Sequence, residues 1–589
     1  MKKGQRLKLI LKNNYACLLI ILTAGGLLFS QTITNHPIVG ADSVFHYNRF
    51  YETYSQLRKH KFSWFQSIYS FNQSGRIVNA VYGPLFAYFN GLLLFVVHSW
   101  YQYQLLASLI IYLIAGYGMY RLARQFNLQQ FIAALTASIY LTIGWASRWQ
   151  TGNNATALGA MLAPYLLQVA YWMVTDPQHP VHWKSLALLM SITIEIHLLS
   201  AILFMLLLIP TWLYALKIAV AKRQLLIQTS KAVSVSLVLT ANTLGPLIFL
   251  SLTNHLVMPA DFDVIKNTLR LDPFSNIRTS ITVFFLSVLF CQLLFAVVTW
   301  RKNHLNLIVT VTGFVFLWGS SHFFPWACLV KAFPSISSYL QFPVRLTILA
   351  YPLLMLGIGF SFDLIVHQRG TKFTQCIGGA ALVLIWLVCL GQAGRVINHR
   401  AQVGFMPRVL ESKTTSVGKS NSAKDRQQVL RATRKRGYRK FLTELQKRIP
   451  DYLTSTKTNT PAMVAAESYA HSVVDRVSNV QIQAASRGRL KLTWTATKRG
   501  TKQLPVVTYR QSQLTVNGHR VNHFARSLVG SPTVKQQKGH NVAYLTYAPP
   551  TWLNALVAVS LLAWLLWAGR ALLILIIRRV NREIGRAPQ

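Results

Sequence analysis

Acidic residues are the scarcest chemical group in this sequence. Its 589 residues include only 15 Asp and Glu against 60 Lys and Arg, which gives a formal net charge of +45. Charged residues make up 13% of the chain, whereas a soluble globular protein usually carries about 25%. This argues against a large water-soluble enzyme, and a hydrophobic content of 52% argues against a disordered chain. The composition predicts a multi-pass membrane protein with a basic part in water.

Cysteine is also scarce, and its spacing predicts no paired chemistry. The five cysteines form no CxxC pair and mostly lie in or beside apolar runs, so we expect packing residues rather than a disulfide framework or a zinc site. The sequence contains no P-loop and no GxGxxG motif opening a βαβ unit, and it therefore predicts no nucleotide-sugar site.

Long apolar runs predict about twelve membrane-spanning helices, because one span needs roughly 20 apolar residues. The runs are 15–30, 103–123, 128–147, 156–174, 185–197, 198–216, 232–253, 281–299, 305–319, 341–364, 373–392 and 552–577. We interpret the apolar stretch 84–98 as an interfacial helix, because the clusters of Lys and Arg that follow the spans then all lie on the cytoplasmic side. This interpretation predicts that both termini are cytoplasmic.

Two long segments are then external: a first loop, 31–102, and a domain, 393–551. The domain holds 28 Lys and Arg against 6 Asp and Glu. Its first half, 408–448, is basic and predicted to be helical, and its second half alternates apolar and polar residues with turn signals such as Asn517-Gly518. That alternation predicts a small antiparallel β-sandwich. The chain thus divides into a transmembrane domain over 1–392, the external domain, and a final helix with a basic cytoplasmic tail over 552–589.

The charge of the external domain has two interpretations. It is either a solvated surface or a surface that attracts anions outside the cell, such as phospholipid headgroups or anionic wall polymers. Nucleic acid is disfavoured as a partner, because no recognition motif accompanies the charge.

The first external loop begins with a carboxylate, an imidazole and a guanidinium in helical spacing. Asp42 follows the first span directly, and His46 and Arg49 follow it at i+4 and i+7. On a helix these positions share one face. Asp42 is interpreted either as a catalytic base or as a helix cap, and His46 either as a group that orients Asp42 or contacts a phosphate, or as a structural residue.

Short motifs in the chain resemble the GT-C superfamily of membrane glycosyltransferases. More closely, they are similar to bacterial membrane proteins labelled "6-pyruvoyl-tetrahydropterin synthase-related", a label that has no counterpart in the chemistry of this sequence. The motifs are GADSVFHYNR at 40–49, YGPLFAY at 82–88, LQFPVR at 340–345 and PDYL at 450–453. The order of first helix, large loop, many spans and external C-terminal domain also fits.

The resemblance implies transfer of a sugar from a polyprenyl-phosphate donor to an acceptor on the outer face, such as a cell-envelope polymer or lipid. An acceptor hydroxyl needs a base within hydrogen-bond reach, and Asp42 fits by position and by resemblance. The leaving lipid phosphate needs positive charge. Arg345 is interpreted as that cation or as an anchor that snorkels to the membrane interface, and Arg49 and His46 are further candidate substrate-binding residues.

One departure from the family concerns a second acid. The segment 147–167 contains Arg148 but no acid, where the resemblance implies an Arg-Gly-Ala…Glu element. The resemblance leaves a divalent metal open, and the missing acid argues against it. Glu195 and His197 lie in an apolar run, where ionisable groups are usually functional. Glu195 either partly replaces the missing acid beside a substrate or forms a buried pair with His197.

The sequence therefore leaves two functions open. The first is a polyprenyl-phosphate-dependent glycosyltransferase of the cell membrane. The second is a non-catalytic envelope protein of GT-C shape whose basic domain holds an anionic polymer or a partner enzyme. A transporter is disfavoured, because we find no paired repeats.

Overall fold

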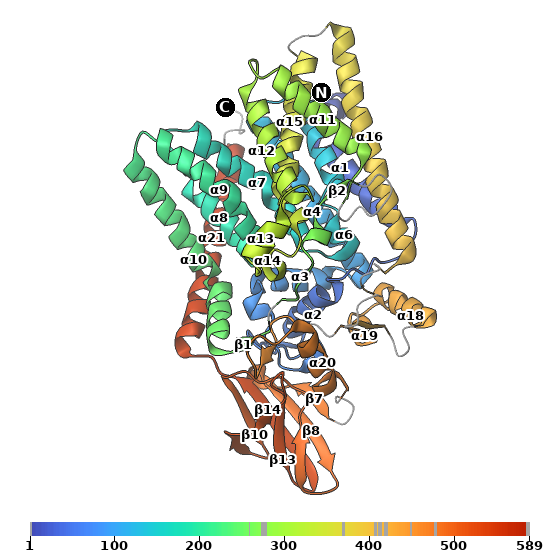
Figure 1. The fold of residues 1–589 in the computed structure, drawn as a ribbon, viewed down its shortest axis with the longest axis vertical. Helices are drawn as coiled ribbons and strands as arrows, with labels where there is room; N and C mark the ends of the chain where they lie inside the picture. Colours follow the sequence, from blue (N-terminus) through green and yellow to red (C-terminus); the bar gives the residue numbers. More distant parts are fainter. Residues whose placement is uncertain are drawn as a thin grey trace.

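A computed structural model describes residues 3–257, 259–271, 280–367, 371–405, 409, 415–417, 422–447, 450–475 and 480–584 of the chain. It has a long helical bundle at one end and two β-sheets at the other (Figure 1). The chain is a multi-pass membrane protein with a β-rich C-terminal part, as the sequence predicts.

Eight described helices are long and apolar enough to cross a membrane. They are α1 (Lys3–Thr32), α4 (Trp100–Gln125), α7 (Thr156–Thr175), α9 (Leu198–Ile218), α10 (Lys222–Thr253), α15 (Thr347–His367), α16 (Lys372–Val403) and α21 (Thr551–Ile584). The start of α1 and the end of α21 lie at the end of the bundle opposite the sheets (Figure 1).

The other four predicted spans are shorter helices. They are α5 (Gln130–Thr142), α8 (Trp183–Ile196), α11 (Val283–Val298) and α12 (His304–Ser320). At about 1.5 Å per residue they reach only about 20–26 Å, less than the roughly 30 Å hydrocarbon core. The division predicted at residue 392 falls inside α16, which continues to Val403.

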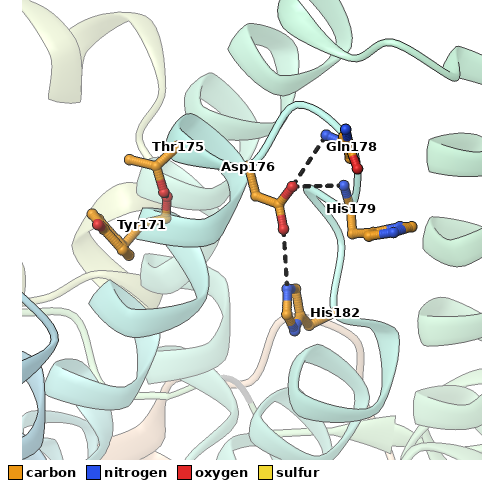
Figure 2. Close-up of polar contacts among 6 residues, drawn as sticks. All are labelled: Tyr171, Thr175, Asp176, Gln178, His179 and His182. Carbon is orange, nitrogen blue, oxygen red and sulfur yellow. Dashed lines mark hydrogen bonds and ion pairs between the residues drawn. The ribbon is translucent and has the colours of Figure 1, made fainter.

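The α7–α8 connection shows how a carboxylate shapes a loop at the bundle's end. One oxygen of Asp176 accepts hydrogen bonds from the backbone N–H groups of Gln178, at 3.1 Å, and His179, at 2.8 Å. Its other oxygen lies 3.9 Å from Nε2 of His182 (Figure 2). The His182 ring also stacks on Trp172. This acid therefore closes a turn.

Short elements lie between the bundle and the sheets (Figure 1). The first loop supplies α2 (Ser43–Lys59), the 3₁₀ turns η1 (Phe71–Gln73) and η2 (Asn79–Val81), and α3 (Pro84–Val96). The stretch predicted to be interfacial is thus the helix α3. Later segments add α6 (Arg148–Gly152), η3 (Ile265–Asn267), α13 (Trp326–Ala332), α14 (Ile336–Tyr339) and η4 (Pro343–Leu346).

The C-terminal part contains two antiparallel sheets that share a core. The larger has the order β11 (His519–Val521), β10 (Ser512–Val516), β14 (Gly539–Tyr547), β8 (Leu490–Ala496) and β7 (Gln481–Ala484). The smaller has the order β12 (Ala525–Arg526), β13 (Pro532–Gln536) and β9 (Gly500–Gln503). Inward side chains of both sheets pack together, for example Leu492 and Val534. Asn517 and Gly518 form the turn of the β10–β11 hairpin with positive φ angles, as predicted.

The basic stretch 408–448 is less continuous than the sequence predicts. Its described part holds α18 (Ala423–Arg434) and α19 (Arg439–Glu444), with β5 (Leu445–Lys447) paired to β4 (Thr415–Val417). The helical path of α18 ends at Lys435, which is extended with ψ of 154°, and Gly437 follows with φ of 94° before α19 begins. The remaining described elements are α20 (Ala462–Ser472), the 3₁₀ turn η6 (Ser486–Gly488), and the short strands β1 (His255–Leu256), β2 (Arg270–Leu271), β3 (Ser280–Ile281) and β6 (Thr454–Ser455).

The first loop and the C-terminal part form one core. Phe65, Ile77 and Val81 of the loop cluster with Tyr469 and Val507 of the C-terminal part, all buried. The segments that the sequence treats as separate external regions are therefore packed on each other.

Candidate functional site

Asp42 lies at the N-terminal end of α2 with its carboxylate partly exposed. Its side chain makes no capping hydrogen bond to the helix. Instead, Oδ2 accepts a hydrogen bond from the side-chain amide of Asn154 at 3.1 Å. Beside it, the hydroxyl of Ser43 donates to Oδ1 of Asn153 at 2.8 Å. The geometry thus offers an acid held by a neutral amide, rather than a cap.

Two motif glycines explain how distant segments meet at this point. A Cβ on Gly40 would lie 2.1 Å from Cα of Gly152, so the backbone before Asp42 can pack against α6 only without a side chain. Gly83 has φ of 59°, and a Cβ there would lie 1.6 Å from the carbonyl oxygen of Glu195. The GxD and YGP motifs therefore bring the first loop against the ends of α6 and α8.

Arg49 is fully buried and holds the next part of the loop in place. Nε donates to Oδ1 of Asn79 at 3.2 Å, and Nη2 donates to the carbonyl oxygens of Tyr82 and, at 3.1 Å, Gly83. Nη1 lies 3.2 Å from Nδ1 of His46, which must accept because Arg has no acceptor. Burial lowers the pKa of Arg49 to about 10, so it stays charged at neutral pH. His46 and Arg49 are thus buried side chains that contact each other, and Arg49 ties α2 to the later part of the first loop.

Arg345 is also buried, within η4. Nη1 donates to the carbonyl oxygen of Leu340 at 2.6 Å and to Oε1 of Gln341 at 3.4 Å, and the guanidinium lies 4.7 Å from the ring centroid of Phe342. Nε has no hydrogen-bond partner among the described residues. The side chain lies inside the protein, which does not match a snorkelling anchor.

Electrostatic interactions link several of these residues. Arg345 interacts with the charge of Asp42. Tyr82 interacts with Asp42, Arg49 and Arg345, and its burial raises its pKa to about 12, so the phenol stays neutral. The C-terminal part reaches this place too, because the ring of Tyr452, from the PDYL motif, lies 6.0 Å from the ring of Tyr82.

Glu195 and His197 are both buried near this site. Oε1 of Glu195 accepts a hydrogen bond from the hydroxyl of Thr243 at 2.8 Å, and its charge interacts with Arg49. Nδ1 of His197 lies 2.7 Å from the hydroxyl of Ser200, and its ring interacts with the charge of Arg345. No hydrogen bond joins Glu195 to His197, both of which are described residues. The six candidate site residues thus lie near one another. Glu195 is hydrogen-bonded to Thr243 and His197 to Ser200, so these two residues do not form a Glu–His pair.

Four further acids, Glu52, Asp261, Asp263 and Asp272, have different places. Glu52 is buried and accepts hydrogen bonds from the backbone of the first loop. Asp261 contacts Ser338, and Asp263 pairs with Lys266 in a surface turn. Asp272 lies outside the described residues. Within the described part of the chain, no three His, Cys, Asp or Glu side chains gather as metal ligands.

A cavity lies against α6, and its lining includes neither Asp42 nor Arg345. It encloses about 860 Å³, open mouth included, and is lined by α5, α6, α11, α15 and α16. Arg148 and Arg400 line it, and no lining residue is acidic. Val344 and Thr347, on either side of Arg345 in the chain, also line it.

Sequence reasoning missed parts of this arrangement. The sequence draws attention to Arg148 only because its segment lacks an acid. It does not identify Arg400 as a cavity-lining residue or Asn154 as the hydrogen-bond partner of Asp42. Arg400 carries no local signal, because it is one of 60 Lys and Arg in the chain. Nothing local distinguishes Asn154, because its partner is far away in the sequence.

Comparisons with known proteins give structural neighbours only. No known family model and no curated protein matches the chain. ArnT from Cupriavidus metallidurans bound to undecaprenyl phosphate aligns at 12% identity and TM-score 0.35, over 66% of this chain and 76% of that one. The apo oligosaccharyltransferase of Archaeoglobus fulgidus aligns at 11% identity and TM-score 0.37, over 66% and 56%. The same enzyme tethered to an acceptor peptide aligns at 12% and 0.35, over 68% and 57%.

The alignment spans little more than half of the archaeal enzyme's length. These neighbours are GT-C glycosyltransferases, and none carries the pterin-synthase-related label. The chemistry of the site therefore has to follow from the chain's own residues.

Proposed function

We propose that this protein is a membrane glycosyltransferase that moves a sugar from a polyprenyl-phosphate donor to an acceptor hydroxyl on the outer face. One observation supports the proposal: a partly exposed carboxylate, Asp42, interacts electrostatically with the buried cation Arg345, and the neighbouring helix α6 lines a cavity whose ionic side chains are the cations Arg148 and Arg400. This transfer requires a base that accepts the proton of the acceptor hydroxyl and positive charge that binds the leaving phosphate.

In the proposed reaction Asp42 accepts the proton of the acceptor hydroxyl as its oxygen attacks the anomeric carbon of the sugar. The bond between that carbon and the phosphate oxygen breaks, and its electron pair leaves with the lipid phosphate. Arg345 and the cavity arginines Arg148 and Arg400 stabilise the charge that grows on this phosphate. Arg49 and His46 act as positioning residues, because they hold the loop that carries Tyr82.

The proposal includes an orientation. The termini are cytoplasmic and the C-terminal domain is external, so that Asp42 faces the side where the donor presents its sugar. The sequence motifs that resemble GT-C enzymes support this orientation, as does the placement of positive charge after the spans.

The test compares envelope glycans and lipids, by mass, in a deletion strain that carries the wild-type chain or Asp42→Asn. The amide keeps the shape of the side chain and removes the base. We expect glycosylation to fall at least about a hundredfold, with unchanged abundance in the membrane, because a positioned base typically contributes 10²–10⁴-fold. Asp176→Asn is the matched control, since this acid closes a turn at the end of α7. Wild-type glycans with Asp42→Asn would refute the assignment.

A second candidate is the non-catalytic envelope protein. It is favoured by one observation: the hydrogen-bond partner of the Asp42 carboxylate in the described structure is a neutral amide, and no second acid completes a metal site there. This candidate predicts that Asp42→Asn leaves the envelope unchanged while loss of anion binding by the external part abolishes function.

A further inference from the structure

A second large concavity lies where α2 and α19 meet the edge of the five-stranded sheet. We call it the basic groove. It encloses about 1010 Å³ of space, open mouth included, and its lining residues are Tyr51, Lys59, Lys61, Tyr69, Gln73, Arg439 and all four residues of β7, Gln481–Ala484. Figure 1 shows α2, α19 and β7 near the junction between the bundle and the sheets.

Three cations from separate segments converge on this groove, and its lining includes no acid. Lys59 ends α2, and Lys61 follows the residue that turns the chain, His60, whose φ is 51°. Arg439 begins α19, far along the sequence. Burial lowers the pKa of Lys59, and repulsion from Arg439 and Lys61 lowers it further. Like charges held together cost free energy that a bound anion would offset.

Structural roles account for only part of this charge. Lys59 suits the C-terminal end of a helix. Lys61 donates to the carbonyl oxygen of Ala484 at 3.0 Å, as lysines that protect an edge strand do. Neither role applies to Arg439, which forms no ion pair with any described acid.

The remaining lining favours a hydroxyl-rich polymer over a lipid headgroup. Gln73, Gln481 and Gln483 offer neutral donors and acceptors, and β7 is the edge strand of its sheet. The Tyr51 and Tyr69 rings offer flat apolar faces, and Lys59 lies 4.8 Å from the Tyr69 ring centroid. This combination of cations, amides and rings suits alternating phosphates and polyol or sugar units.

We propose that the basic groove binds an anionic polymer with repeating phosphodiester groups, and that this polymer is the acceptor in the reaction. The acceptor role rests on the proposed transferase function, whereas binding itself does not. Lys59 is 17 residues from Asp42 along α2, a distance of about 25 Å at 1.5 Å per residue. A linear polymer can reach from the groove to the carboxylate, which a single headgroup cannot.

The test measures binding of a fluorescein-labelled poly(glycerol phosphate) oligomer to the full chain in phosphatidylcholine nanodiscs. One triple variant removes the charge of the groove: Lys59→Gln, Lys61→Gln, Arg439→Gln. We expect it to weaken binding at least about tenfold at low salt. We also expect its affinity to depend less steeply on salt concentration, because binding through fewer phosphate contacts releases fewer counterions. Asp42→Asn is expected to bind like the wild type. The loss of glycosylation in Asp42→Asn therefore tests the proposed transferase activity, whereas this binding assay tests the groove.

Two control variants make the result decisive. Arg499→Gln, Lys535→Gln, Lys538→Gln removes the same charge from exposed positions elsewhere on the sheets and is expected to bind normally. Lys59→Arg, Lys61→Arg, Arg439→Lys keeps the charge of the groove and is expected to retain binding. Equal loss in both Gln triples, or loss in neither, overturns the proposal. Displacement of the oligomer by phosphatidylglycerol vesicles at matched phosphate concentration overturns it in favour of a lipid headgroup.

Discussion

At the scale of single residues, Glu52 shows how a buried carboxylate can be structural. It is 1% exposed and accepts hydrogen bonds from the backbone N–H groups of Ile68, Tyr69 and Ser70 at 2.8–2.9 Å. Glu52→Gln places an NH₂ group against these donors, so we expect a loss of about 1–3 kcal/mol in stability. The thermal unfolding midpoint in detergent checks this, with the exposed acid Glu467→Gln as control. Equal midpoints for the two variants would contradict it.

Residues of the site differ in how far the sequence could reveal them. Asp42 and Arg345 stand out because acids are few and because short motifs surround them. Asn154 and Arg400 could not be recognised, because a neutral amide and one more cation among 60 Lys and Arg carry no local signal. Their roles depend on packing between segments that are far apart in the chain.

At the scale of elements, the junction between the first loop and α8 depends on Gly83. Its positive φ and the 1.6 Å approach of a Cβ to the Glu195 carbonyl leave no room for a side chain. We expect Gly83→Ala to displace the loop and lower both thermal stability and transfer activity, because the obstructing atom is backbone. Gly391→Ala, in α16 with open space around it, should leave both unchanged or slightly raise stability. An active, stable Gly83→Ala protein would show that the junction is not required.

Helices and strands with a long apolar run or a regular apolar–polar alternation could be predicted from the sequence. Long apolar runs identify the eight long helices, and alternation with the Asn517-Gly518 turn identifies the sheets. The run 128–147 overstates α5, which covers only Gln130–Thr142, because a run of apolar residues also describes a short buried helix. Composition alone missed the break between α18 and α19, which begins at the extended residue Lys435 and includes Gly437 at a positive φ.

At the scale of the whole molecule, the shared core of the first loop and the C-terminal part makes the site depend on both. Val507 is fully buried there, and its N–H donates to the Ser74 carbonyl oxygen at 2.7 Å. Val507→Asp is therefore expected to speed amide hydrogen exchange across 65–81, although the substitution lies in the C-terminal part, because an unpaired carboxylate in the core destabilises both partners. Thr501→Asp, at an exposed position of β9, should leave that exchange unchanged.

The same coupling affects any attempt to separate the two candidate functions by deletion. Removing 400–548 would expose Phe65, Ile77 and Val81 and disturb the loop that carries Tyr82, so activity would be lost whichever function is correct. Point variants avoid this ambiguity. If Val507→Asp left the exchange of 65–81 unchanged, the loop would be independent of the C-terminal part, and the deletion would become a clean test of whether that part or Asp42 carries the function.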